Sequence, residues 1–348
     1  MQLDSVAQIA ELDFDTIIDV RSPSEFAEDH IPGAINLPVL DDDQRARVGT
    51  IYKQVSSFDA RKIGAALVAE NAAHHLREAL AEKDGGWRPL VYCWRGGQRS
   101  GSFTTILRQV GWRAELVEGG YKTWRRLVVE ACAAPMPCPV VVLDGNTGSA
   151  KTDILKAAGG QGAQVIDLEG LANHRGSLFG AREGGQSSQK DFESRLARAI
   201  TALDPARPVL LEAESSKIGD LQLPKGIWGA ICSAPRIRIK APLAERAAYL
   251  ARAYGDITAD SARLSAVIDK LRPFHAAERI ERWQAQAAAG EFAALAGELM
   301  ADHYDPRYEK HRARQAFDEQ VIEASSLEAD AIAGLAAQVI KAAQAAPS

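Results

Sequence analysis

Tyr92–Ser100, with the sequence YCWRGGQRS, decides the fold of the first part of this chain, because an apolar strand there runs into a cysteine loop and then a helix. In such a loop the backbone N–H groups and the helix N-terminus point at one spot, which attracts an anion and lowers the pKa of a thiol. We therefore predict that Cys93 is a catalytic cysteine. The alternative is a buried structural cysteine, since free cysteine is often buried. The predicted anion-binding residues of the loop are Arg95, Gly96, Gly97, Arg99 and Ser100.

The composition is typical of a globular protein with reduced thiols. The 348 residues, 46% hydrophobic and 25% charged, are enough for two domains. The 4 cysteines show no C-x2-C spacing, which favours neither a disulfide framework nor a zinc site. No apolar run approaches the ~20 residues that span a bilayer, and the first residues do not resemble a secretory signal. We expect a cytoplasmic protein with no membrane partner. The net charge of −5 gives no support for nucleic-acid binding, although local basic patches matter more than the sum.

Four blocks place the cysteine loop in a known kind of domain. A strand, Thr16–Val20, leads to Arg21, and Ser22–Phe26 then has the capping pattern of a helix start. His30–Asn36 contains a Pro-Gly turn, and Glu118–Trp124 follows the helix after the cysteine. In this order, together with the cysteine loop, the blocks resemble a rhodanese domain. The resemblance implies a parallel α/β sheet and a cysteine that carries sulfur or selenium as a persulfide or perselenide.

The same loop also fits a different chemistry. The spacing from Cys93 to Arg99 is C-x5-R, the pattern of cysteine-dependent phosphatases, some of which share the rhodanese fold. In those enzymes the thiolate attacks phosphorus while the arginine and the loop amides hold the phosphoryl oxygens. The loop by itself therefore does not separate selenium or sulfur transfer from phosphate-ester hydrolysis.

A second motif begins after a proline-rich stretch at residues 131–139. The apolar strand Val140–Asp144 runs into GNTGSAKT and then a helix, which is a P-loop with alanine in place of its last glycine. Alanine keeps every N–H, so we expect phosphate binding and leave nucleotide turnover open. Lys151 supplies a positive charge, and Thr152 is a candidate ligand of Mg²⁺. The predicted phosphate-binding residues are Gly145, Asn146, Thr147, Gly148, Ser149, Ala150, Lys151 and Thr152.

Polar residues follow two further strands of this second domain, Gln164–Leu168 and Pro208–Glu214. Open α/β sheets bind ligands at the carboxyl ends of their strands, so we expect some of these side chains to face a ligand. Glu212 also fits the place of a metal-positioning acid, and the alternative for both glutamates is an ordinary strand-end carboxylate. The candidate ligand-facing residues are Asn173, His174, Arg175, Ser177, Glu212 and Glu214.

The rest of the chain is predicted from its periodicity. Ile227–Cys232 and Arg236–Lys240 have strand patterns, and the second suits a half-exposed or edge strand. The last helix, Leu327–Lys341, has an apolar stripe that we expect to pack on the P-loop domain. The other expected helices are Leu243–Tyr254, Asp260–Arg272 and Ala276–Met300.

A rhodanese-like domain followed by a P-loop domain resembles the tRNA 2-selenouridine synthase family over nearly the whole chain. Ala150 departs from the usual P-loop. The blocks that carry the resemblance are Tyr92–Ser102, Gly145–Thr152, Asp167–Gly180, Leu211–Gly219 and Tyr304–Tyr308.

The resemblance implies a transferase that modifies the wobble 2-thiouridine in the anticodon region of tRNA. The base sulfur would first be alkylated by geranyl diphosphate, whose diphosphate the P-loop would hold. The geranylthio group would then be replaced by selenium from selenophosphate, carried by Cys93. The resemblance therefore implies geranyl diphosphate and selenophosphate as co-substrates and no tightly bound cofactor. It leaves open whether Mg²⁺ is required. A selenophosphate-producing enzyme is a candidate partner, and we expect a monomer.

The predicted organisation is a rhodanese-like parallel-sheet domain at 1–130, a linker at 131–139, a P-loop NTPase-like α/β domain at 140–300 and a helical C-terminal extension at 301–348. Two other functions remain open: a P-loop kinase or nucleotidase with a regulatory rhodanese domain, and a C-x5-R phosphatase.

Overall fold

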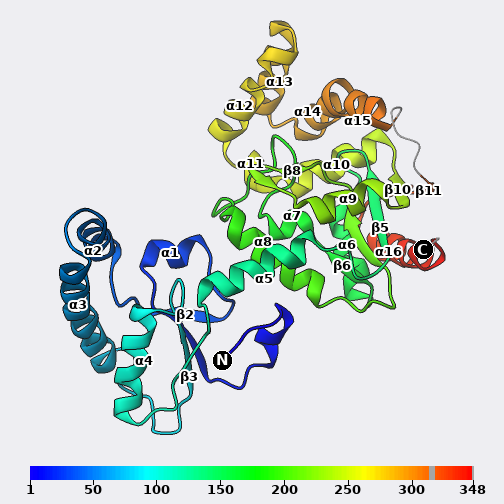
Figure 1. Cartoon of the computed structure of the whole chain (residues 1–348). Helices are drawn as coiled ribbons and strands as arrows, with labels where there is room; N and C mark the ends of the chain where they lie inside the picture. The colour runs from blue at the N-terminus through cyan, green and yellow to red at the C-terminus, as the bar shows by residue number, and fades with distance from the viewer. Residues whose placement is uncertain (313–317, 347–348) are drawn as a thin grey trace. The chain divides into compact units, whose positions relative to one another are not determined.

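The computed structural model describes residues 1–312 and 318–346 and divides the chain into two compact units (Figure 1). The first unit comprises Met1–Ala134 and Ser187–Ala202, and the second comprises Pro135–Gln186 and Leu203–Ser348. Both contain a parallel sheet with helices, which confirms the predicted fold class. The domain ranges predicted from the sequence, which place residues 187–202 in the P-loop domain, remain a prediction.

The first unit is built on a four-stranded parallel sheet with the order β2-β1-β3-β4. Ile18 and Val91, on the two central strands, are buried with Phe103 of the helix that follows the cysteine. Burial on both faces explains why these strands are continuous apolar runs. The elements are η1 (Ala7–Glu11), β1 (Thr16–Asp19), α1 (Pro23–Glu28), β2 (Ala34–Asn36), α2 (Asp42–Gln54), α3 (Ser57–Arg77), β3 (Pro89–Tyr92), α4 (Gln98–Val110), β4 (Glu115–Leu116), α5 (Tyr121–Ala133) and α8 (Gln189–Thr201).

Local sequence signals set the limits of two helices near the cysteine loop. Ser22 and Glu25 form the capping box of α1, with Pro23 at its first position, as predicted. Gly111 ends α4 in the left-handed conformation, with φ of 111°. These signals fix the residue at which α1 begins and the residue at which α4 ends.

Helix α8 lies far along the sequence but packs on α5 in the first unit. The indole of Trp124 donates to the hydroxyl of Ser194 at 3.3 Å, and Ser194 donates to Asp29 at 2.9 Å. Phe192 and Leu196 on α8 are fully buried. The sequence does not predict this packing, because nothing in the local pattern of α8 indicates its partner.

The second unit is built on a five-stranded parallel sheet with the order β11-β10-β5-β7-β6. Helices α6 and α16 pack together on it, and Leu335 and Val339 of α16 join its core as predicted. The elements up to the fourth sheet strand are β5 (Val140–Gly145), α6 (Lys151–Gly160), β6 (Gln164–Ile166), α7 (Leu168–Leu171), β7 (Val209–Glu212), β8 (Lys217–Ile218), β9 (Leu221–Gln222), α9 (Lys225–Ser233) and β10 (Arg236–Lys240).

Of the two strands predicted before the helical region, one was wrong and the other was confirmed. Residues 227–232 form part of helix α9, in which Ile227 and Ile231 are buried four positions apart. A short apolar run fits a strand and a buried helix equally well, which explains the error. Arg236–Lys240 forms strand β10 as predicted. Only the edge-strand alternative fails, since the unpredicted strand β11 (Glu319–Glu323) pairs with β10 on the side opposite β5.

Helices dominate the chain between β10 and β11, in the yellow-green to orange part of Figure 1. The helix predicted at 276–300 is interrupted at Gly290, which has φ of 74°, so it forms two helices. A π-helical turn follows them, a feature that often marks a functional site. The remaining elements are α10 (Leu243–Ala253), α11 (Gly255–Thr258), α12 (Ser261–Asp269), η2 (Arg272–Phe274), α13 (Ala277–Ala289), α14 (Phe292–Leu299), η3 (Met300–Tyr304), α15 (Asp305–Arg312) and α16 (Ala329–Ala345).

Candidate functional site

The Cys93 thiol lies directly after β3 and is only 3% exposed. Ser100, in the first turn of α4, donates its hydroxyl to the Cys93 sulfur at 3.1 Å. Burial by itself raises the pKa of the Cys93 thiol. The hydroxyl and N–H of Ser100, the N–H of Arg95 and the charge of Arg99 outweigh burial and bring this pKa below its ordinary value. By contrast, burial raises the pKa of Cys132 to about 12. Cys93 is therefore prepared to act as a thiolate.

A glycine at the start of α5 makes room for the cysteine loop. Gly120 has φ of +61°, and a Cβ there would lie 2.3 Å from the carbonyl oxygen of Cys93, so only glycine fits. The N–H of Tyr121 donates to the same carbonyl at 2.8 Å, and the N–H of Lys122 donates to Trp94 at 3.0 Å. These bonds hold the carbonyls of the loop toward α5 and leave loop N–H groups to face the sulfur.

The two loop arginines differ in their surroundings. Arg99 donates to Glu25 at 2.9 Å, and Glu25 also pairs with Arg45 at 2.8 Å. This anchoring holds the Arg99 charge near the thiol. Arg99 also lines a cavity of about 330 Å³ together with Arg61. Arg95 is exposed. The loop thus combines a fixed positive charge with one that is free to meet a ligand from solvent.

A buried ion pair belongs to a network that stabilises the cysteine loop. Arg21 is fully buried, pairs with Asp19 at 2.6 Å and donates to the carbonyl of Asp29 at 2.6 Å. Its guanidinium lies 3.9 Å from the centroid of the Tyr121 ring. The hydroxyl of Tyr121 donates to the Asp29 carboxylate at 2.7 Å. This network fixes the first residue of α5 and, through it, the cysteine loop.

The P-loop of the second unit connects β5 to α6. Ala150 adopts the left-handed conformation, with φ of 56° and ψ of 26°, at the position where the usual motif has glycine. This costs an alanine about 1 kcal/mol. The ammonium group of Lys151 donates to the carbonyl of Gly145 at 2.9 Å, and the hydroxyl of Thr152 donates to Glu169 at 3.0 Å. The loop therefore keeps the P-loop conformation despite the substitution.

A polar cavity of about 470 Å³ opens over the P-loop. Its positive charges suit an anionic ligand such as a diphosphate, which the N–H groups of the P-loop can also bind. The P-loop residues that line it are Thr147, Gly148, Ser149, Ala150, Lys151 and Thr152. The charged residues that other elements contribute include Lys156, Glu169, Arg175, Arg182 and Glu214.

Three of the candidate ligand-facing residues line this cavity: Arg175, Ser177 and Glu214. Arg175 is held in place by Asp256 at 2.9 Å, and its guanidinium lies 4.7 Å from the centroid of the Tyr254 ring. The loop after β6 thus brings a positive charge and a hydroxyl to the phosphate-binding region.

The other three candidates bind backbone groups. The Asn173 amide donates to two loop carbonyls at 3.0 and 2.8 Å. His174 accepts the N–H of Gly176 at 3.1 Å. The buried carboxylate of Glu212 accepts the N–H of Leu168 at 2.8 Å. None of the three is among the described residues that line the cavity.

Two glutamates near the cavity have a raised pKa. Burial, followed by the charge of Glu169, raises the pKa of Glu214 to about 8, although Lys151 opposes the shift. Burial and the same neighbouring carboxylate also raise the pKa of Glu212 well above its ordinary value. A neutral Glu214 does not repel a bound anion and can donate a hydrogen bond to it.

The block Tyr304–Tyr308 reaches the P-loop through Asp305. Its carboxylate accepts two hydrogen bonds from Arg246, at 3.0 and 2.7 Å, and one from the amide of Asn146 at 2.9 Å. Arg246 also donates to the carbonyl of Thr147 at 3.1 Å. These hydrogen bonds connect the helical part of the unit to the P-loop. The side chain of Asn146 therefore makes a structural contact with Asp305.

Several cavity residues were missed from the sequence. Tyr304 and Tyr308 stood in a family block but were not predicted as site residues. Tyr249, Tyr254 and Arg182 also line the cavity. The last three have no motif around them, so no local signal could have identified them.

The described residues, 1–312 and 318–346, contain no group of three or more His, Cys, Asp or Glu side chains placed to hold a metal ion. Within the same part of the chain, no helix combines the length and the apolar character needed to cross a membrane.

Comparisons with known proteins agree with this architecture. Residues 3–127 match the family model of the rhodanese-like domain, and residues 138–276 match that of the tRNA 2-selenouridine synthase AAA domain. A tRNA 2-selenouridine synthase from Alcanivorax borkumensis is 36% identical over 335 residues, which cover 86% of this chain and 90% of that protein. Another from Chromohalobacter salexigens is 32% identical over 326 residues, 84% of this chain and 86% of that protein. A solved N-terminal domain of a putative ATP/GTP binding protein from Clostridium difficile 630 is 35% identical, covers 36% of this chain and 98% of that chain, and has a TM-score of 0.32.

Proposed function

Because this chain belongs to the tRNA 2-selenouridine synthase family, we propose that it is a transferase that replaces the sulfur of wobble 2-thiouridine in tRNA with selenium. The exchange runs through an S-geranylated intermediate, with geranyl diphosphate and selenophosphate as co-substrates. The two chemical steps use different parts of the chain.

The P-loop unit performs the alkylation. The sulfur on C2 of the base attacks C1 of geranyl diphosphate, the C1–O bond breaks, and diphosphate leaves with the electron pair while the base loses its N3 proton. Lys151 and the P-loop N–H groups stabilise the charge that develops on the departing diphosphate. The cavity of about 470 Å³ and its charged lining support this assignment.

Alkylation prepares the base for exchange. A nucleophile that adds to C2 must expel the sulfur, and a sulfur bound to a geranyl chain departs as a thiolate, which solvent protonates. The free thiocarbonyl offers no comparable leaving group. The diphosphate chemistry and the selenium chemistry are therefore consecutive, and the P-loop has no need to hydrolyse a nucleotide.

The Cys93 loop binds the selenium donor and carries out the selenium step. Selenophosphate is a tetrahedral anion, and Arg95, Arg99 and the loop N–H groups suit such a ligand. The Cys93 thiolate adds to C2 of the geranylated base and expels the geranylthiolate, and the selenium of selenophosphate then displaces Cys93 from C2. Water breaks the Se–P bond and releases phosphate. The single observation that carries the proposal is the Cys93 thiol itself, held under hydrogen-bond donors that lower its pKa. A P-loop by itself would suit many phosphate ligands.

Nucleoside mass spectrometry of tRNA tests the proposal. Cells lacking the protein are complemented with wild type, Cys93→Ser, Lys151→Ala or, as a control, Cys232→Ser, which alters an exposed cysteine on α9. We expect 2-selenouridine with wild type and Cys232→Ser. Cys93→Ser should accumulate S-geranyl-2-thiouridine, and Lys151→Ala should leave 2-thiouridine.

Other results would identify a different function. Persistence of 2-selenouridine without the protein would contradict the proposal, and selenation by Cys93→Ser would remove Cys93 from the selenium path. ATP turnover that Lys151→Ala abolishes would instead support a kinase or nucleotidase. Hydrolysis of an aryl phosphate that depends on Cys93 and Arg99 would support a phosphatase.

The need for Mg²⁺ belongs to the same proposal. Thr152 and Glu169 are hydrogen-bonded to each other at the P-loop, and a divalent ion that arrives with the diphosphate would meet both. We expect EDTA to slow geranylation of tRNA and added Mg²⁺ to restore it. Unchanged geranylation in EDTA would assign the charge neutralisation to the protein side chains.

A further inference from the structure

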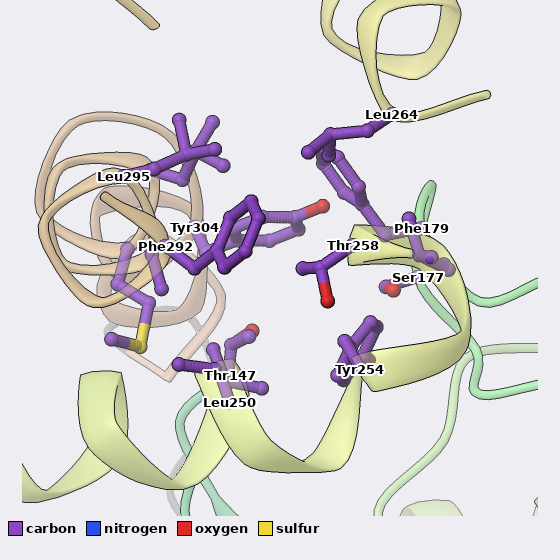
Figure 2. Close-up of a pocket in the computed structure, with 15 residues that line it drawn as sticks. Thr147, Ser177, Phe179, Leu250, Tyr254, Thr258, Leu264, Phe292, Leu295 and Tyr304 are labelled. Atoms are coloured by element: carbon purple, nitrogen blue, oxygen red, sulfur yellow. The ribbon is translucent and has the colours of Figure 1, made fainter. Parts of the chain in front are cut away.

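A second cavity adjoins the one over the P-loop, and its walls differ in character (Figure 2). The residues that line both cavities are Thr147, Ser177, Leu250, Tyr254 and Tyr304. The two cavities therefore share a boundary, which is lined by Thr147 of the P-loop, by Leu250 of α10 and by the two tyrosines.

The second cavity is apolar. Figure 2 shows side chains from the helices and from the loop at 177–179 converging on it, with Thr147 at the bottom of the view and Leu264 and Leu295 at the top. Phe179 and Phe292 complete much of the wall. Among the described residues that line it, none is charged, and the polar side chains are hydroxyls. The space measures about 70 Å³, far less than the polar cavity.

We propose that this apolar cavity binds the hydrocarbon chain of a prenyl diphosphate whose diphosphate group lies on the P-loop. The inference rests on the proposed function and deepens it by assigning the chain a binding site. An apolar cavity that opens beside a phosphate-binding loop fits a ligand with one apolar and one anionic end. A nucleobase fits less well, because its polar edge would lose hydrogen bonds to water without amide or charged partners in the wall.

The structure holds the two parts of this site together. Arg246 on α10 pairs with Asp305 at 2.7 Å and donates to the carbonyl of Thr147 at 3.1 Å. Leu250, one turn further along α10, lines both cavities. The distance from the P-loop to the apolar wall is therefore set by a partly buried ion pair, and on this proposal the cavity selects chains by length.

The far wall determines which chain fits. Ala296 and Leu295 on α14 both line the apolar cavity. A larger side chain at Ala296 would shorten the space, and a smaller one at Leu295 would lengthen it. Each methylene that is no longer buried weakens binding about fourfold. Ala293, on the same helix but exposed, provides a matched control.

The test compares binding of inorganic diphosphate with dimethylallyl, geranyl and farnesyl diphosphates by titration calorimetry of the full chain without tRNA, so that no transfer occurs. We expect wild type to bind geranyl diphosphate more tightly than inorganic diphosphate. Ala296→Phe should weaken geranyl diphosphate binding about tenfold and shift preference toward the dimethylallyl compound. Leu295→Ala should improve farnesyl relative to geranyl diphosphate. Ala293→Phe should bind all four like wild type.

Binding of inorganic diphosphate within twofold of wild type shows that each variant is folded. If wild type prefers geranyl diphosphate but both lining variants keep that preference, the cavity assignment is wrong and geranyl transfer stands. If wild type binds no prenyl diphosphate more tightly than inorganic diphosphate, the geranylation step of the proposed function fails as well.

Discussion

At the scale of single residues, one hydroxyl distinguishes Cys93 from a buried structural cysteine. Ser100 donates to its sulfur at 3.1 Å. This hydrogen bond favours the thiolate, so its removal should raise the pKa of Cys93. We expect Ser100→Ala to slow alkylation of Cys93 at neutral pH and to shift the pH dependence of that reaction upward, followed by mass spectrometry of the Cys93 peptide.

Ser102→Ala is the matched control, because Ser102 lies exposed on the same helix. It should leave the pH dependence unchanged. An unshifted profile in Ser100→Ala would mean that the loop N–H groups and Arg99 are sufficient to stabilise the thiolate.

A second residue-scale prediction concerns Glu214, whose pKa of about 8 lies above the ordinary value of 4.5. Between these two pH values the folded chain keeps a proton that the unfolded chain releases. The free energy of unfolding should therefore fall as pH rises from about 4.5 through about 8. Glu214→Gln should reduce this fall, measured by urea unfolding at several pH values.

Glu183→Gln, on an exposed loop position, is the control and should follow the wild-type pH dependence. Identical pH profiles for wild type and Glu214→Gln would show that this carboxyl group ionises normally in the folded protein.

At the scale of elements, the P-loop carries strain in Ala150, with φ of 56°. Ala150→Gly relieves the left-handed conformation but also increases the freedom of the unfolded chain, so we expect a net stabilisation of roughly 0.5–1 kcal/mol. The measurement is urea unfolding, with diphosphate binding as a check that the loop still works. Ala157→Gly, inside α6, should instead destabilise by about 1 kcal/mol. A destabilised Ala150→Gly would show that the alanine side chain contributes packing that outweighs its strain.

At the scale of the whole molecule, α8 belongs with the first unit, although β5, α6, β6 and α7 separate it in sequence from α5. A fragment of residues 1–134 lacks the helix that covers Trp124 and bonds to Asp29. We expect a synthetic peptide of residues 187–202 to raise the melting temperature of this fragment in proportion to the logarithm of its concentration above Kd. A peptide with Phe192→Asp should have no effect. A fragment that melts independently of the wild-type peptide would show that α8 adds nothing to this unit.

Much of the fold could be predicted because its signals are local. The capping box of α1, the glycine that ends α4 and the strand-loop-helix pattern of the P-loop each depend on a few neighbouring residues. The prediction at 227–232 failed because a short apolar run fits two structures, and this run forms helix α9. The strand at 236–240 was predicted correctly, but its internal place in the sheet was not, because β11 pairs with it from far along the chain.

The cysteine loop and the P-loop were determined by the sequence alone, because an anion-binding loop needs glycines and N–H groups at adjacent positions. The tertiary structure decided what surrounds them. Gly120 contacts Cys93, Asp305 contacts Asn146, and α8 packs on α5 only in the folded chain. These groups are distant in sequence, and burial and long-range hydrogen bonds hold them together. The apolar cavity beside the P-loop has the same origin, since its walls come from helices and a loop that share no motif.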